Sequence, residues 1–139
     1  MIQLIVGAKG KGKTKHLLEK VNNAVKTVDG NIVYLDKNSK HMYELKNRIR
    51  LINTSEFPFS TSEEFLGFLC GIVSQDHDLQ EMYLDGFLKC AKLKEDNITD
   101  TILKLDAVST LFNIDFIISV SVAQEDLDER LKDKVLLSL

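Results

Sequence analysis

The sequence has no apolar run close to the roughly 20 residues that a membrane-spanning helix needs. Its N-terminal apolar stretch, residues 1–6, is too short for a secretory signal and leads directly into glycines and lysines. Cysteine is scarce: neither Cys70 nor Cys90 has a CxxC partner or a histidine at metal-ligand spacing. These absences predict a cytoplasmic protein with reduced, mostly buried thiols and no zinc site.

Repeats, low-complexity stretches and Gly/Ser linkers are also missing, and Pro58 is the only proline. The length of 139 residues suits one domain, 1–139, with little room for a second. Hydrophobic residues make up 44% and charged residues 28% of the chain, a balance typical of a globular protein with a core.

Positive charge is concentrated in the first part of the chain. Residues 1–50 carry eleven Lys and Arg against four Asp and Glu, whereas residues 51–139 carry seven against seventeen. Several of the lysines lie close together at 9–15, which a phosphate ligand explains more economically than a nucleic-acid groove does. The acidic second half disfavours a broad nucleic-acid surface.

Short apolar runs alternate with longer periodic segments. Runs at 2–6 and 32–35 flank a segment, 13–28, in which apolar residues recur every three or four positions. Such a strand–helix–strand unit requires a parallel sheet. Further strands are predicted at 50–53, 82–85, 116–122 and 135–137, and further helices at 39–46, from Ser60 or Thr61 to Asp76, 98–112 and 126–132. We expect a three-layer α/β/α sandwich with a mainly parallel sheet of five or six strands.

One motif carries specific chemistry. It matches the P-loop (Walker A) pattern G-x-x-x-x-G-K-[ST] between a predicted strand and a predicted helix. Its glycines let successive N–H groups turn toward a β-phosphate, and the helix N-terminus favours the same anion. Lys13 is predicted to reach the β- and γ-phosphates, and the Thr14 hydroxyl to coordinate Mg²⁺. The predicted nucleotide-binding residues are Gly7, Ala8, Lys9, Gly10, Lys11, Gly12, Lys13, Thr14 and Lys15.

On these residues the chain resembles the P-loop NTPase superfamily, over about 2–36 and again near Asp85. It is also similar to small P-loop proteins of Gram-positive bacteria that are loosely described as twitching-motility-type ATPases. Residues 9–14 resemble, over that short stretch only, the loop of corrinoid adenosyltransferases. The resemblance implies a P-loop NTPase fold that binds ATP with magnesium.

The resemblance also implies an acid at the end of a neighbouring strand, which would hold the magnesium through water. Asp85 is the preferred candidate, as a magnesium ligand and catalytic residue beside Lys13, because three apolar residues lead into it. Asp36, which follows 32–35, is the alternative. Ser119 and Ser121 lie on the predicted strand where related proteins place a polar residue that senses the γ-phosphate.

Two groups typical of rapid hydrolysis are missing. Many ATP-hydrolysing relatives place a glutamate directly after the magnesium acid, but Gly86 stands there. Asp36 could be the base only if its strand adjoins the first strand. The arginines are Arg48, Arg50 and Arg130, and none has the position expected of a catalytic finger. If hydrolysis is efficient, a protein partner would supply the arginine.

Three functions remain open. The first is an ATP-binding protein with slow or partner-stimulated, magnesium-dependent ATPase activity. The second is a nucleotide-dependent interaction module with little catalysis. The third, ranked lower because no arginine-rich lid is visible, is a small-molecule kinase or nucleotidyl transferase. Adenine is a default, because 35–38 lacks the order of a guanine-binding motif.

Overall fold

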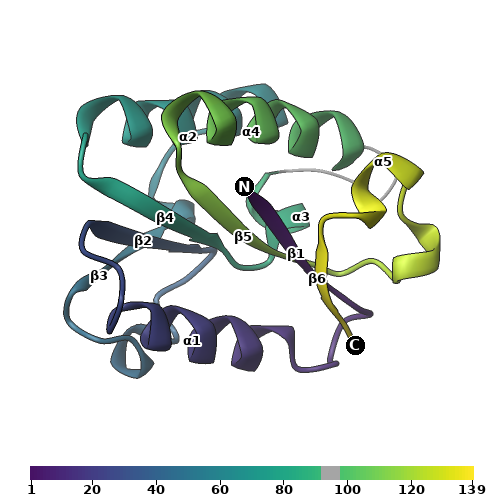
Figure 1. Cartoon of the computed structure of the whole chain (residues 1–139), viewed down its shortest axis with the longest axis horizontal. Helices are drawn as coiled ribbons and strands as arrows, with labels where there is room; N and C mark the ends of the chain where they lie inside the picture. Colours follow the sequence, from purple (N-terminus) through teal and green to yellow (C-terminus); the bar gives the residue numbers. More distant parts are fainter. Residues whose placement is uncertain (92–97) are drawn as a thin grey trace.

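A computed structural model describes residues 1–91 and 98–139. Six strands form one sheet, in which all the neighbouring pairs are parallel (Figure 1). The strand order is β3-β2-β4-β5-β1-β6. The expectation of a mainly parallel sheet of five or six strands is therefore confirmed. The strands are β1 (Ile2–Val6), β2 (Asn31–Asp36), β3 (Ile49–Asn53), β4 (Leu79–Leu84), β5 (Asp115–Val120) and β6 (Val135–Ser138).

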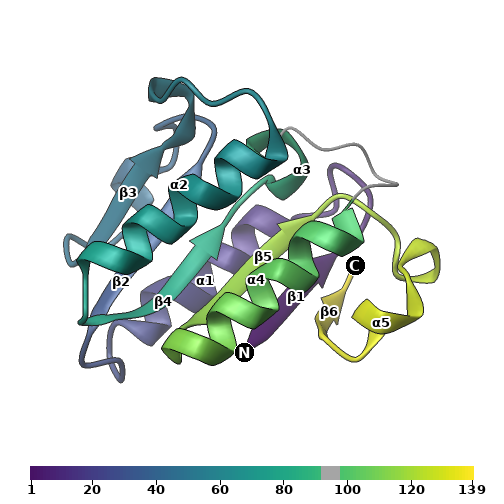
Figure 2. The same ribbon diagram turned by 90° about the horizontal axis from the view of Figure 1, so that it is seen from above.

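Helices cover both faces of this sheet. Figures 1 and 2 show α1 (Lys13–Ala24) on one face, with α2 (Ser62–Gln75) and α4 (Ile98–Phe112) side by side on the other. Two four-residue helices, α3 (Phe87–Cys90) and α5 (Glu129–Lys132), lie in the connections that follow β4 and β5. No helix in the described ranges is long and apolar enough to cross a membrane.

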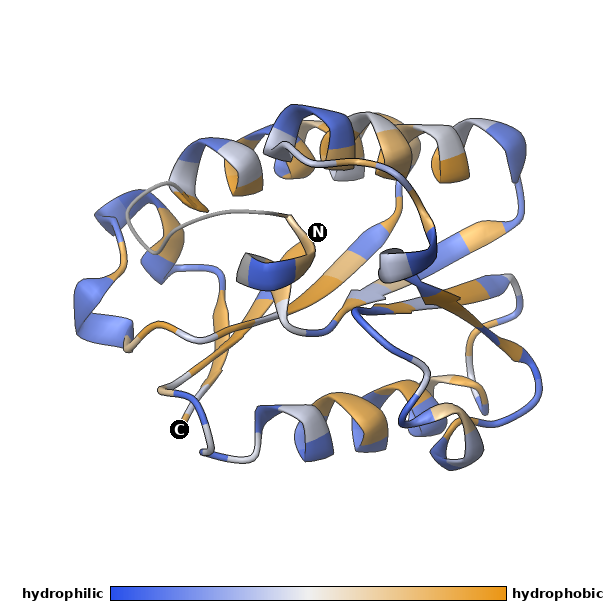
Figure 3. Cartoon of the chain, turned by 180° about the vertical axis from the view of Figure 1, so that it is seen from behind, coloured by the Kyte–Doolittle hydropathy of each residue, from blue (hydrophilic) through white to orange (hydrophobic). Residues whose placement is uncertain are grey.

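The strands are apolar over most of their length because both of their faces are covered. In β1, Leu4 and Val6 belong to the larger core cluster, which includes α2 and α4. Ile5 points the opposite way, into the cluster that contains Leu17 and Val21 of α1. Figure 3 shows the corresponding pattern, with hydrophobic colour on the sheet and on the inner sides of the helices.

The start of α2 follows the predicted capping signal. Thr61 is the N-cap, and its Oγ1 accepts a hydrogen bond from the Glu64 N–H at 3.1 Å. The Thr61 hydroxyl also lies 3.2 Å from the Glu64 carboxylate, to which it can donate. Such a cap satisfies an N–H group that has no partner inside the helix.

Three helical predictions differ from the structure. The first helix ends at Ala24 rather than Val28, because the chain tightens into i→i−3 turns and Arg48 donates to the Val25 carbonyl at 2.9 Å. The predicted helix at 39–46 is a single 3₁₀ turn, Met42–Glu44; its two spaced apolar residues differ, since Met42 is 48% exposed and Leu45 is buried. The predicted helix at 126–132 is divided into a 3₁₀ turn, Gln124–Asp126, and α5.

The cysteine predictions hold in part. Both thiols are free; Cys90 is buried and Cys70 is only half-buried. Burial raises the pKa of the Cys90 thiol to about 11, so this group is protonated at neutral pH.

Candidate functional site

The glycine-rich loop connects β1 to α1. Gly12 has φ 90° and ψ 21° at the residue before α1, a left-handed conformation that glycine adopts without strain. At the other end of the loop, the Gly7 N–H donates to the Val122 carbonyl at 3.0 Å. A Cβ added to Gly7 would lie only 2.8 Å from the Leu139 carbonyl oxygen, so close packing also requires glycine there.

Lys13, the first residue of α1, folds back over this loop. Its Nζ donates to the carbonyls of Gly7 at 2.8 Å and Ala8 at 3.0 Å. The side chain is only 8% exposed. Burial lowers the pKa of Lys13, and the nearby Asp85 carboxylate opposes that shift. The ammonium group is therefore held at a fixed place on the floor of the loop, beside a carboxylate.

Asp85 follows β4 and is the polar centre of the site. Three hydroxyl groups donate to its carboxylate: Ser119 at 2.8 Å, Tyr34 at 3.0 Å and Thr14 at 3.2 Å. Ser119 Oγ also accepts from the Gly86 N–H at 2.9 Å. Asp85 is 5% exposed, and these donors compensate for the burial of its charge.

The strand order explains why these residues meet. In a parallel sheet the carboxyl ends of all strands lie at one edge, where ligands commonly bind in α/β proteins. β4 lies between β2 and β5, so Tyr34 of β2 and Ser119 of β5 approach Asp85 from either side. β1 is the next strand beyond β5, and its loop brings Thr14 to the same carboxylate.

Asp36 occupies a different place at this edge. Its Oδ1 accepts from the Lys37 N–H at 2.7 Å, and its side chain is 5% exposed. Burial, together with the Asp85 charge, raises the pKa of Asp36. Asp36 is expected to act as the base only if its strand adjoins the first strand. It does not, because β4 and β5 lie between β2 and β1.

These side chains surround a cavity of about 530 Å³. Seven of the ten residues predicted to bind the nucleotide or magnesium line it, whereas Gly7, Lys11 and Lys15 do not; the further candidates Asp36, Ser119 and Ser121 line it too. Figure 2 shows two of the contributing segments, the loop after β1 and α3, at the same end of the sheet. The lining residues are Ala8, Lys9, Gly10, Gly12, Lys13, Thr14, Asp36, Lys37, Asn38, Lys40, His41, Asp85, Gly86, Lys89, Ser119 and Ser121.

Sequence reasoning missed several polar groups of this site. The sequence indicates Tyr34 only as a strand residue. Burial and the Asp85 charge raise the pKa of its hydroxyl far above the ordinary value. Lys37 follows the acid of β2 directly, a position that could have indicated its place at the strand edge. Lys89 had no comparable signal, because the short helix α3 was not predicted.

The arginines lie elsewhere. Arg48 donates to the carbonyls of Val25 and Gly30, and Arg130 forms a local ion pair with Asp128 at 3.0 Å. Among the described residues that line the cavity, the cations are lysines. In the described part of the chain, no group of three or more His, Cys, Asp and Glu side chains could hold a metal unaided.

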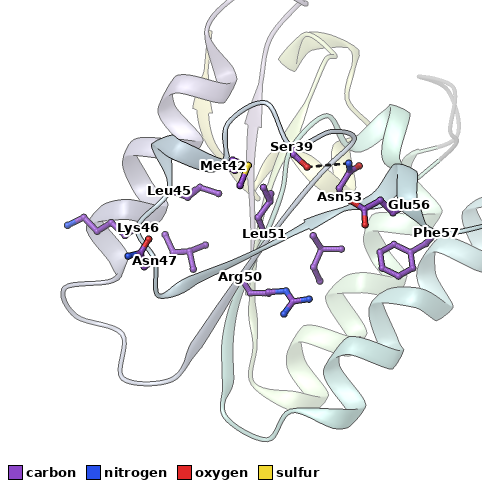
Figure 4. A pocket seen from close by; sticks show the side chains of 12 residues that line it. Ser39, Met42, Leu45, Lys46, Asn47, Arg50, Leu51, Asn53, Glu56 and Phe57 are labelled. Carbon is purple, nitrogen blue, oxygen red and sulfur yellow. Dashed lines mark hydrogen bonds between the residues drawn. The ribbon is translucent and has the colours of Figure 1, made fainter.

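A second hollow lies at the edge strand β3 and is shown in Figure 4. Its volume is about 390 Å³, and it mixes apolar side chains with scattered polar ones. Asn53 and Ser39 are bonded to each other at 3.4 Å there, so neither defines a point of ligand recognition. The cavity at the carboxyl edge has the converging polar groups that a binding site needs.

Comparison with known proteins adds no relative. No protein-family model matches the chain, and a search of curated proteins returned no match. The fold therefore defines the class of this protein: a parallel α/β protein with a six-stranded sheet and helices on both faces of the sheet.

Proposed function

We propose that the cavity at the carboxyl edge binds a nucleoside triphosphate with magnesium, ATP being the default, and that the chain is a P-loop ATPase of slow or partner-stimulated activity. One observation carries the proposal: Thr14, which ends the P-loop pattern, bonds to Asp85 at 3.2 Å although 71 positions separate them. This contact joins the predicted pair of magnesium-holding groups at one point beside Lys13.

The residues present fit such a ligand. Gly10 and Gly12 add no side chains to the loop, both have positive φ, and no atom would contact a Cβ built at either. A cavity of about 530 Å³ is within the usual range of about 300–1,000 Å³ for small-molecule sites. Magnesium keeps several waters and takes few protein ligands, so Thr14 and Asp85 suffice beside phosphate oxygens.

Each residue then has a defined task. The main-chain N–H groups of the loop would surround the β-phosphate, and Lys13 would exchange one carbonyl partner for phosphate oxygens. Thr14 would turn its hydroxyl oxygen to the magnesium ion, and Asp85 would hold that ion through water. Magnesium, when bound, would neutralise charge on the β- and γ-phosphate oxygens.

The strand order favours Asp85 over Asp36 as the magnesium acid. Only β5 separates the strand of Asp85 from β1, and Ser119 on that strand donates to Asp85. Asp36 is one strand farther away and faces Lys37. The same strand order, with one strand between β1 and the strand of Asp85, supports the proposal that this α/β protein has a P-loop NTPase fold.

Slow turnover is part of the proposal. Gly86 begins α3 with φ 63° and offers no carboxylate next to Asp85. The described cavity lining also contains no arginine to stabilise a transferred phosphoryl group. The same observations favour the second candidate, a nucleotide-dependent interaction module whose output is a changed surface.

Calorimetry with matched variants tests the proposal. Lys13→Ala should weaken MgATP binding about 10- to 100-fold, the range expected for lost charge-assisted hydrogen bonds. Lys11→Ala is the control, because the Lys11 side chain does not line the cavity and its main-chain N–H is kept. Absence of MgATP and MgGTP binding by folded wild type would refute the proposal, as would equal losses in both variants.

Turnover then separates the candidate functions. ATP hydrolysis by the chain alone, abolished by Asp85→Asn, supports the ATPase. Tight binding with negligible turnover supports the interaction module, and turnover that requires an added acceptor metabolite supports a kinase.

A further inference from the structure

The charges of the cavity are unevenly distributed. Five lysines line it against two aspartates. In the inner part, Lys13 lies beside Asp85 and is bonded to two carbonyls. Beyond this pair, the cavity is lined by the other four lysines, Lys9, Lys37, Lys40 and Lys89, and by the second aspartate, Asp36. The lining therefore carries more positive charge than its two aspartates offset.

Three of these lysines line the cavity from three separate segments: Lys9 from the loop after β1, Lys37 directly after β2 and Lys89 from α3. The nearby Lys37 side chain, together with the charge of Lys9, lowers the pKa of Lys89. None of the three takes part in an ion pair within the described residues. Like charges without counter-ions are unfavourable unless an anion joins them.

The backbone that carries Lys37 and Lys89 is tied together beneath them. The Thr54 hydroxyl donates to the Asp36 carbonyl at 3.1 Å, and its oxygen is 3.6 Å from Cys90 Sγ. The Cys90 thiol donates in turn to the Asp85 carbonyl at 3.3 Å. Thr54 and Cys90 are buried, so this network fixes the positions from which the two lysines project.

We infer that Lys9, Lys37 and Lys89 form a second oxyanion site, which holds a phosphate group other than the β-phosphate that the loop N–H groups surround. This inference rests on the proposed function, since the second phosphate would share the cavity with the nucleotide. The shared chemistry is a phosphate dianion held by ammonium groups. It can be the terminal phosphate of the nucleotide or the phosphate of a separate small molecule.

The test uses the full chain and the double variant Lys37→Gln/Lys89→Gln. The control is Lys26→Gln/Lys46→Gln, which removes the same charge from exposed positions outside the cavity. Calorimetry measures MgADP, MgATP, and inorganic phosphate added to MgADP-saturated protein. The cavity variant should keep wild-type MgADP affinity while losing about 10- to 100-fold in binding of the second phosphate.

The MgATP and inorganic phosphate titrations distinguish the two possible origins of the second phosphate. If the preference for MgATP over MgADP disappears in the cavity variant, the site holds the terminal phosphate. If that preference persists but inorganic phosphate no longer binds beside MgADP, the site holds a separate molecule. The inference is overturned if neither property changes, if MgADP binding falls equally, or if the control loses as much. Failure of wild type to bind MgADP or MgATP at all would instead remove the proposed function itself.

Discussion

At the scale of single residues, the site is organised by one buried carboxylate and the hydroxyls around it. Ser119 makes the shortest of these bonds to Asp85, at 2.8 Å, and is 2% exposed. Removing it would leave the carboxylate with two donors and the Gly86 N–H without its partner. We expect Ser119→Ala to lower the free energy of unfolding by about 2 kcal/mol, measured by urea denaturation.

Ser121 provides the matched control for that prediction. It lines the same cavity two positions along the chain, has no side-chain hydrogen bond in the described structure, and is half-buried. Ser121→Ala should change the free energy of unfolding by less than about 0.5 kcal/mol. Equal effects of the two substitutions would show that the Asp85 network does not stabilise the fold.

Asp36 gives a prediction with a pH dependence. Its pKa is raised above the ordinary 3.8 in the folded protein, so the folded state favours the protonated acid. The stability that this preference contributes is complete below pH 3.8 and is lost as the pH rises through the raised pKa. Asp36→Asn should therefore be more stable than wild type at pH 7, with the difference vanishing near pH 3.8, in urea denaturation across that range. A difference that grows toward acid pH would contradict it.

The same residues show what a sequence can reveal about a site. The P-loop pattern predicts the glycines, Lys13 and Thr14 as site residues because each proposed role suits only certain residue types, and Gly10, Gly12, Lys13 and Thr14 do line the cavity. Tyr34 could not be identified, since a tyrosine in an apolar strand is usually a core residue and its hydroxyl partner is 51 positions away. Lys89 depends on a four-residue helix with no periodic pattern.

At the scale of elements, helices with strong local signals were predicted best. The fourth helix spans Ile98–Phe112 as expected from its apolar period, and the start of α2 follows its cap. The helix predicted at 39–46 does not form: the segment has no side-chain cap, and only Leu45 packs into the core while Met42 is exposed, which is too little to stabilise a short helix.

The cap of α2 can be tested directly. Thr61→Ala removes the oxygen that accepts from the Glu64 N–H and should lower the free energy of unfolding by about 1 kcal/mol. Thr61→Ser keeps the acceptor and should stay close to wild type in the same urea denaturation. If both variants lose the same stability, the methyl group of Thr61 matters rather than the cap.

At the scale of the whole molecule, strand order is what the sequence left undetermined. Alternating strands and helices predict a parallel sheet, but each strand is hydrophobic on both faces and carries little information about its neighbours. The order places β4 and β5 between β1 and β2, although β1 and β2 are consecutive in the chain. That insertion brings Asp85 rather than Asp36 to Thr14, the acid that the local sequence favoured without the strand order that explains the contact.

The proposed ligand should therefore stabilise the entire chain, because its contacts come from loops that follow β1, β2, β4 and β5. A ligand that binds only the folded state at 100 times its Kd adds about 2.7 kcal/mol. For a chain of 139 residues this corresponds to a rise in Tm of roughly 5–10 °C. We expect that rise with MgATP, little of it with AMP or with ATP plus EDTA, and at most about half of it in Lys13→Ala under the same conditions, because a 10-fold weaker affinity leaves the ligand at about 10 times its Kd. A rise that is indifferent to magnesium and to Lys13 would mean that ATP binds outside the cavity, and the P-loop would then have no part in it.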